Sequence, residues 1–181
     1  LEEPMPKEED IIPLYREETN NIGNDFEPVA RCAEIGYLEP VEAQSFITLA
    51  SVSMEDLEKT EKKTVIGSGE NVYASQDNLY IAESHYQYIG PLLVRNEESE
   101  NKETTTIHKF SIGDGNIDYK GSMEAKGRIL NQFSMDEFNN DFRIATTIGQ
   151  VSRVEDKSTN NIYIFGEDLK LKGSLEDLAP G

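Results

Sequence analysis

Short runs in which apolar and polar residues alternate recur along the chain from residue 45 onward. These runs are rich in Val, Ile, Thr, Tyr and Phe, which favour β-strands, and Gly, Asn and Asp separate them. Because successive side chains of a strand point to opposite faces, the pattern predicts half-buried strands. We expect them at residues 46–52, 63–66, 71–75, 78–82, 104–112, 117–123, 133–138, 142–148, 161–165 and 169–175.

Tight-turn residues occupy the short links between several of these strands. Asn, Asp and Gly adopt left-handed backbone angles at low cost, which hairpin turns require. We therefore expect turns at residues 76–78, 113–116, 139–141 and 166–168. The stretch 95–103 is acidic and rich in Asn and Ser, so it is expected to be a solvated loop.

Two hairpins along the chain share one pattern. Residues 107–110 with 117–123 parallel residues 162–165 with 169–175, and each second strand reads apolar, polar, apolar, Lys, Gly, Ser, apolar. A further hairpin precedes each of them, at 72–82 and at 133–146. The repeating unit is thus a meander of four antiparallel strands in about fifty residues, as in a blade of a β-propeller.

The sequence therefore predicts an all-β chain that forms part of a β-propeller. The expected regions are an irregular arm at 1–44, the outer two strands of a preceding blade at 45–70, a first full blade at 71–126 and a second full blade at 127–181. A sandwich of consecutive hairpins is the alternative. The regular spacing of hairpin pairs favours the propeller.

The arm at residues 1–44 shows neither a helical nor a two-residue period. It contains Pro4, Pro6, Pro13, Pro28 and Pro40 among many acidic residues, which is typical of an extended segment. Scattered apolar residues indicate that parts of it pack on a neighbouring surface, and full disorder is the alternative.

Several longer segments resemble a family of bacterial and archaeal secreted proteins with a C-terminal β-propeller domain distantly related to WD-type repeats. The resemblance is carried by residues 67–75, 77–82, 104–110, 127–137 and 143–147, and by the ending at 175–181. It covers most of the chain from about Phe26. The resemblance implies a cell-envelope or extracellular setting and further blades on both sides, and it implies no catalytic residue.

The charge balance limits the classes of partner. With 17 basic and 35 acidic residues the net charge is −18, which repels nucleic-acid backbones and anionic membrane surfaces. No stretch approaches the roughly 18 apolar residues of a membrane span, and the acidic start is unlike a signal peptide. We expect an excised piece of a longer protein, with an open blade edge that either pairs with another copy or is protected by the arm at residues 1–44.

The sequence contains few cysteine or histidine residues that could bind a metal or form a disulfide. Cys32 is the single cysteine, so no internal disulfide can form. The two histidines, His85 and His108, are too few for a histidine-based metal cluster and are expected to be structural or exposed to solvent.

One group of residues combines acid, hydroxyl and base. Ser134, Asp136 and Glu137 lie near Arg128 at the entry to the second predicted blade. Paired carboxylates could perform acid–base chemistry or bind a sugar. The alternative is a charged turn whose hydrogen bonds tie one blade to the next.

Two further motifs are incomplete. Asp114, Asn116 and Asp118 alternate as at the start of a calcium loop, but the later glycine is missing and Ala125 replaces the final acid, so a hairpin turn is favoured. The Gly-rich link 67–70 lacks both the P-loop lysine and the nucleophile-elbow pattern.

Tyrosines could form an aromatic binding surface. Tyr73 and Tyr80 are expected to pack between blades, whereas Tyr86 and Tyr88, near a strand end, are as well suited to ligand binding as to packing.

The sequence favours a non-enzymatic scaffold or binding module outside the cytoplasm, for a protein, peptide or glycan. An extracellular hydrolase or lyase that uses Asp136 and Glu137 is the alternative, and a calcium-dependent adhesion module is a third possibility. No catalytic, cofactor-binding or metal-ligating residue is assigned.

Overall fold

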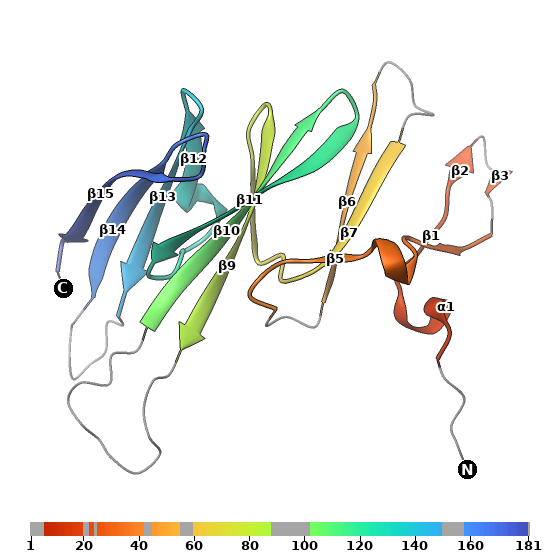
Figure 1. Ribbon diagram of the computed structural model, residues 1–181, viewed down its shortest axis with the longest axis horizontal. Coiled ribbons are helices and arrows are strands. Elements are labelled where there is room, and N and C mark those ends of the chain that lie inside the picture. The colour runs from red at the N-terminus through yellow and green to blue at the C-terminus, as the bar shows by residue number, and fades with distance from the viewer. Residues whose placement is uncertain are drawn as a thin grey trace, which may run out of the picture. The chain divides into compact units, whose positions relative to one another are not determined.

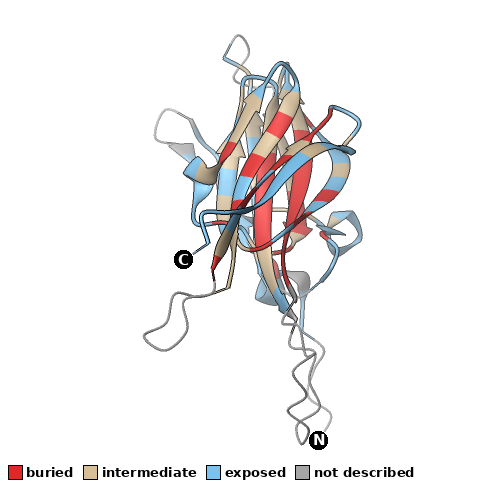
Figure 2. Ribbon diagram, turned by 90° about the vertical axis from the view of Figure 1, so that its left-hand side faces the viewer, coloured by how far each residue is buried: buried red, intermediate tan, exposed pale blue. Residues whose placement is uncertain are grey.

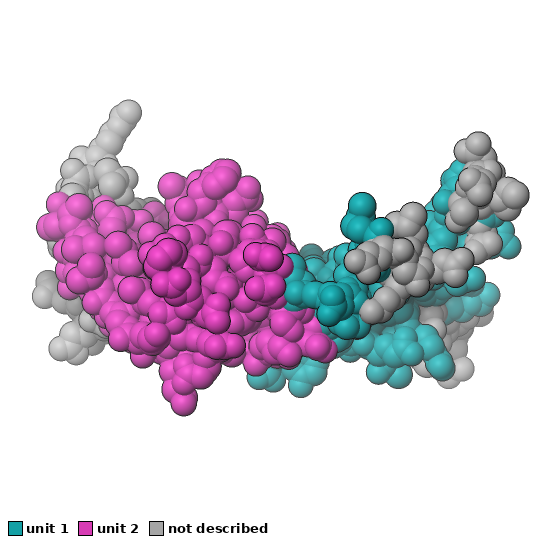
Figure 3. All heavy atoms as spheres, turned by 90° about the horizontal axis from the view of Figure 1, so that it is seen from above, with its two compact units in different colours: residues 1–68, 112–117 teal, residues 69–111, 118–181 magenta. Residues whose placement is uncertain are grey.

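The computed structural model describes residues 6–19, 22–23, 25–41, 45–54, 60–87, 102–149 and 158–180. The chain divides into two compact units, one of residues 1–68 and 112–117, the other of residues 69–111 and 118–181 (Figure 3). Each unit is built mainly of β-strands and is described separately.

Two four-stranded antiparallel sheets account for most of the second unit, and they lie beside each other (Figure 1). The first has the order β11-β10-β9-β8 and the second the order β12-β13-β14-β15. The strands of the first sheet are β8 (Asn71–Ala74), β9 (Asn78–Gln87), β10 (Lys102–Gly113) and β11 (Asn116–Lys126). Those of the second are β12 (Met135–Phe138), β13 (Asp141–Ile148), β14 (Thr159–Phe165) and β15 (Leu171–Leu178), after the 3₁₀ turn η2 (Gln132–Ser134). Each sheet is a meander, and the pair confirms two consecutive propeller blades.

Left-handed residues close two of the hairpins as expected. Asp114 and Gly115 have φ of 51° and 78°, and Asn139 and Asn140 have φ of 52° and 65°. Positive φ at both central residues is the requirement of a type I′ turn, whose twist matches that of the strands. The turn residues in the sequence thus fix where these hairpins reverse.

The hairpin between β14 and β15 differs from the prediction. Leu169 was expected to begin the strand, but it lies in the turn with φ of 63°, and β15 begins at Leu171. The Leu169 N–H donates to the Gly166 carbonyl at 2.9 Å, and the Leu169 side chain packs against the core. Tertiary packing therefore holds a leucine in a conformation that its own backbone preference disfavours.

The hydrophobic core of this unit lies between the two sheets. It contains Tyr80, Ala82, Ile107, Met123, Ala125, Ile129, Met135, Phe142, Ile144, Tyr163 and Phe165. The rings of Tyr80 and Phe142 stack with centroids 4.2 Å apart. Buried positions lie along the strands, whereas the turns are exposed (Figure 2). Each sheet thus buries its apolar side against the other, as stacked blades do.

Glycines allow the closest approaches between the sheets. A Cβ on Gly121, which has φ of +134°, would lie 2.7 Å from Leu169 Cδ1. A Cβ on Gly127, with φ of +87°, would lie 2.9 Å from the Thr147 carbonyl oxygen. Since both positions also need positive φ, other residues are strained there.

The link between the blades is anchored by backbone acceptors. The Thr105 hydroxyl donates to the Gly127 carbonyl at 2.7 Å, and the Thr146 hydroxyl donates to the Lys126 carbonyl at 2.5 Å. The two threonines come from different sheets, so the chain crosses between blades under constraint from both.

The first unit contains a three-stranded sheet in the order β5-β7-β6. Strands β6 (Phe46–Val52) and β7 (Thr60–Ile66) form the expected hairpin, and β7 begins earlier than predicted. Strand β5 (Gly36–Tyr37) pairs with β7 in parallel and was not expected. Its two residues are too few for a strand pattern to be read from sequence.

The remaining arm is irregular, as the sequence indicated, with very short elements. These are α1 (Glu8–Ile11), β1 (Leu14–Tyr15), β2 (Glu18–Thr19), β3 (Ile22–Gly23), β4 (Glu27–Pro28) and η1 (Cys32–Glu34). The Lys62 ammonium on β7 lies 3.4 Å from the Tyr15 ring centroid and 3.0 Å from a Glu17 carboxylate oxygen. The described part of the arm therefore packs on the sheet of its own unit.

The all-β, partial-propeller prediction is confirmed, and the strand ends need correction. Strand β9 continues to Gln87, and β10 starts at Lys102 within the expected loop, of which residues 95–101 lie outside the described residues. Phe133 belongs to η2 and is exposed, whereas a strand was expected to start there. Within the described part of the chain, no helix has the length and apolar character that crossing a membrane requires.

Truncation of the core aromatic at position 142 tests the contact between blades. Phe142 is 1% exposed and Phe138, at the end of the neighbouring strand, is 59% exposed. Phe142→Ala should lower the free energy of unfolding by about 3 to 5 kcal/mol, since it opens a cavity against Tyr80. The matched change Phe138→Ala should cost about 0.5 kcal/mol. Urea denaturation of both variants measures the difference, and equal losses would contradict this core.

Candidate functional site

The carboxylate of Glu137 joins the two sheets. It accepts hydrogen bonds from the Ser75 hydroxyl at 3.0 Å, the Asn78 amide at 3.1 Å and the Tyr80 hydroxyl at 2.7 Å. The Glu137 N–H also donates to the Tyr73 hydroxyl at 3.0 Å. Burial, followed by the hydrogen bond and charge of Glu137, raises the pKa of Tyr80. The tyrosine therefore remains a protonated donor to the carboxylate.

The neighbouring acid, Asp136, belongs to the opposite face of β12. Asp136 pairs in register with Arg143, whereas Glu137 pairs with Phe142. The Arg143 Nε donates to Asp136 Oδ1 at 2.7 Å, and Arg143 Nη2 donates to Asp136 Oδ2. This hydrogen bond raises the pKa of Arg143. Because successive strand residues face opposite ways, the two acids do not converge as a catalytic carboxylate pair.

Arg128 does not join this group, although the sequence placed it nearby. Its Nη1 donates to the Gly149 carbonyl at 2.9 Å and lies 3.6 Å from a Glu103 carboxylate oxygen. The same carboxylate accepts from the Gly149 N–H at 3.2 Å. The buried Glu103 thus connects the start of β10 with the end of β13, which the sequence did not reveal because residue 103 was assigned to a loop.

These contacts bear on the two interpretations of the acidic group. Glu137 ties one blade to the next through hydrogen bonds, which agrees with the structural interpretation. Ser134 lies in η2, where its N–H donates to the Asn131 carbonyl at 3.0 Å. Within the predicted group of Arg128, Ser134, Asp136 and Glu137, Asp136 takes its base from outside the group, as a surface pair with Arg143.

His108 is fully buried on β10. Its Nδ1 lies 3.2 Å from the Tyr119 hydroxyl oxygen, and its Nε2 has no hydrogen-bond partner within the described segments. Burial, followed by the charge of His85, lowers the pKa of His108 to about 4. The ring is therefore neutral near pH 7, as a structural histidine would be.

The tyrosines and the acidic hairpin have structural positions. Tyr80 lies in the core and Tyr73 packs against it, which confirms that both pack between blades. Tyr86 is exposed near the end of β9, and Tyr88 lies outside the described residues. Residues 113–116 form the expected hairpin turn, and three or more potential metal ligands do not cluster anywhere in the described ranges.

A hollow of about 330 Å³ lies at the turn end of the second unit. It is lined by Asn78, Lys109, Ser111, Lys120, Glu167, Asp168 and Leu169. The first four belong to the first blade, and the others form the turn between β14 and β15. The hollow thus lies between two blades, and Leu169 is the one apolar residue among those that line it.

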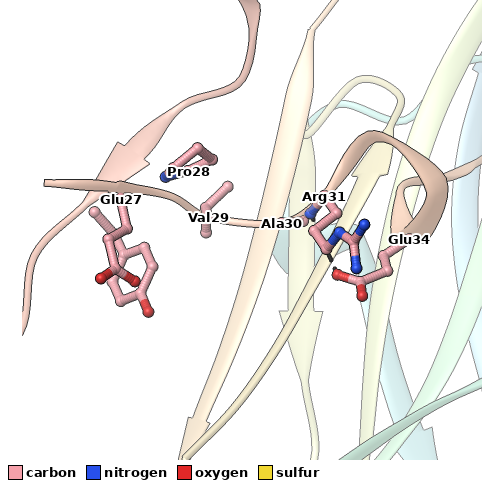
Figure 4. A pocket seen from close by; sticks show the side chains of 7 residues that line it. Glu27, Pro28, Val29, Ala30, Arg31 and Glu34 are labelled. Carbon is pink, nitrogen blue, oxygen red and sulfur yellow. Dashed lines mark hydrogen bonds between the residues drawn. The ribbon is translucent and has the colours of Figure 1, made fainter. Parts of the chain in front are cut away.

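A second hollow, of about 370 Å³, lies in the arm (Figure 4). It is lined by Tyr15, Glu27, Pro28, Val29, Ala30, Arg31 and Glu34. The Arg31 N–H donates to Glu34 Oε2 at 3.2 Å. Nearly all of its lining comes from one short stretch of chain. The hollow between the blades, which is lined by residues distant in sequence, is therefore the stronger candidate for a binding site.

Residues 2–181 match the family model described as Beta propeller domain. The chain belongs to this family. The match extends over both described blades and the sheet of the first unit, so the architecture and the family assignment agree.

Two curated relatives match parts of this propeller chain. The uncharacterized protein MJ1554 of Methanocaldococcus jannaschii is 42% identical over 85 residues, which is 47% of this chain and 13% of that protein. An uncharacterized protein of Archaeoglobus fulgidus is 35% identical over 74 residues, 41% of this chain and 10% of that protein. The aligned regions are thus a small part of either relative. No solved structure matches the chain.

Adjacent acids on β12 provide a test of the link between propeller blades. Glu137→Ala should lower the free energy of unfolding by about 2 to 3 kcal/mol, because it leaves three donors without their charged acceptor. Asp136→Ala removes an exposed ion pair and should cost about 1 kcal/mol or less. Chemical denaturation compares the two variants, and a larger loss for Asp136→Ala would rule out the role given to Glu137.

The buried histidine predicts a pH dependence of stability. Because the folded pKa of His108, about 4, is below its ordinary value of 6.5, the unfolded chain binds the proton more readily. The stability from a neutral His108 is present above pH 6.5 and is lost as the pH falls toward 4, by on the order of 3 kcal/mol.

Replacement of the ring isolates this contribution. His108→Gln should reduce the slope of unfolding free energy against pH between 4 and 6.5, while NMR titration of the native ring should place its pKa near 4. An unchanged slope together with a ring that titrates near 6.5 would show that burial does not suppress the charge.

Proposed function

We propose that this propeller segment is a non-catalytic scaffold and binding module outside the cytoplasm, and that its turn end holds a protein, peptide or glycan. The position of the acids carries the proposal. Asp136 and Glu137 lie on opposite faces of β12 and each is bonded to structural partners, whereas an open hollow lined mainly by polar and charged residues lies between the blades. Loops and turns on a rigid scaffold are where binding residues concentrate.

One feature of the sequence supports the extracytoplasmic part of this proposal, and another supports the partner class. Residues 67–75 and 104–110 resemble secreted proteins whose propellers are distantly related to WD-type repeats. The net charge of −18 disfavours binding to nucleic acid, which leaves proteins, peptides and glycans as partner classes.

The outward face of the second blade supports a place within a longer propeller. Ala145, Ile162 and Leu175 form one row across β13, β14 and β15, and Ile162 and Leu175 are exposed. Propeller blades bury such faces against the next blade, and the relatives extend far beyond the regions they share with this chain. Self-association of the isolated chain through an uncovered blade stays a prediction.

Binding arrays of glycans and peptides test the proposed function. We expect the chain to retain a subset of these ligands and to release them unchanged, since Asp136 and Glu137 face opposite sides of β12 and cannot act together on one ligand. Mass spectrometry of the eluted ligands measures whether they have been cleaved.

The double variant Asp136→Asn with Glu137→Gln serves as the control for catalysis. Shortened glycan or peptide products that appear with the native chain and disappear with this variant would replace the binding module with a hydrolase or lyase. Ligand binding that needs added calcium would favour an adhesion module instead.

A further inference from the structure

The side chain of Lys109 is largely buried, and it forms no ion pair with the part of the chain that the structure describes. The residue is 6% exposed, and its ammonium lies 5.7 Å from the centroid of the Tyr80 ring. Tyr80 faces it in register across β9 and β10. Among the described residues no carboxylate lies within ion-pair distance of this ammonium. Lys109 also lines the hollow at the turn end, so an anion that enters this hollow can reach its side chain.

The ammonium lines the hollow at the turn end, where a second lysine joins it. Lys120 also lines the hollow, and its ion pair with Asp118 is loose, at 3.9 Å between exposed side chains. Two lysine side chains of the first blade therefore line the hollow, within a chain that is otherwise strongly acidic.

The carboxylates of the opposite wall do not neutralise Lys109. Asp168 lies 3.2 Å from the Lys170 ammonium, and hydrogen bonds from Lys170 lower the pKa of Asp168. Glu167 is exposed in the same turn. An anion that enters from solvent can approach Lys109 from the open side of the hollow.

The lining of the hollow restricts the chemistry of this anion. Ser111, Asn78 and the two turn carboxylates are hydrogen-bonding groups suited to hydroxyls, and Leu169 is the one apolar lining residue among those described. The net charge of −18 repels polyanions such as polyphosphate, so a single carboxylate per ligand unit is favoured. The volume of about 330 Å³ is within the range of small-ligand sites.

We propose that this hollow binds one acidic sugar unit, a hexuronate, whose carboxylate pairs with Lys109 and Lys120. The sugar hydroxyls then hydrogen-bond with Ser111 and Asp168, and Leu169 covers the less polar side of the ring. The proposal rests on the proposed binding function and deepens it by naming the ligand class and the residue that recognises its charge.

Titration with D-glucuronate, followed by NMR or calorimetry on the 181-residue chain, tests the site. Glucuronate should bind at millimolar concentration, and D-glucose should bind at least about tenfold more weakly, because it lacks the charge-assisted contacts. Lys109→Met keeps most of the buried stem and should weaken glucuronate binding about tenfold or more.

Two matched variants complete the comparison. Lys126→Met removes an exposed lysine of β11 that pairs with Glu176, and it should leave the affinity unchanged. Glu167→Gln removes a repelling carboxylate from the hollow and should strengthen binding by about twofold or more. Urea denaturation of each variant shows that the chain is folded before its affinity is compared.

Distinct results would overturn the inference. These are an absence of glucuronate binding at tens of millimolar, equal binding of glucose, an unchanged affinity in folded Lys109→Met, and weaker binding in Glu167→Gln. Equal binding of N-acetylaspartate would exclude the sugar in favour of an acidic peptide. If the glycan and peptide arrays still reveal a bound ligand, each of these results leaves the proposed binding function intact. If the arrays reveal no ligand but glucuronate binds in the titration, the binding function is restricted to this one hollow.

Discussion

The side chain of Tyr80 takes part in both the apolar packing and the hydrogen bonding between the two blades. Its ring stacks on Phe142, and its hydroxyl donates to Glu137 at 2.7 Å. A blade of a propeller has no core of its own and depends on its neighbour to bury its faces. The apolar stacking supplies the burial, and the hydrogen bond fixes the lateral position of one sheet on the other, since a slip would leave both groups unpaired.

The hollow at the turn end depends on this same contact. Lys109 lies opposite Tyr80 in the first blade, and the turn that closes the hollow comes from the second blade. Leu169 can approach because Gly121 has no side chain, since a Cβ there would lie 2.7 Å from Leu169 Cδ1. The binding surface proposed for this protein is therefore a product of two blades together, and neither alone contains it.

The alternation of strand residues explains why the acidic sequence at the start of the second blade does not form a catalytic pair. Neighbours in a strand face opposite sides, so Glu137 enters the contact between blades and Asp136 remains on the outer face with Arg143. Two adjacent acids in a sequence suggest a catalytic carboxylate pair. Within a strand, however, their side chains lie on opposite faces of the sheet.

The order of the strands and the two type I′ turns were predictable, because the alternation of side chains and the preferences of Asn, Asp and Gly are local properties. The packing of Tyr73 and Tyr80 also followed from their strand positions. By contrast, the left-handed Leu169, the buried Glu103 and the short parallel strand β5 were missed. Each depends on groups distant in sequence: Gly121 for Leu169, Arg128 and Gly149 for Glu103, and β7 for β5.

By itself, then, the sequence determined an all-β chain of repeated meanders, since periodicity and turn chemistry act over a few residues. Only the tertiary structure decided which faces of β12 carry Asp136 and Glu137, where Arg128 pairs, and that Lys109 lies beside a hollow with no ion pair to the described residues. The physical reason is that burial and pairing of charges are set by the neighbouring blade, whose residues lie far along the chain.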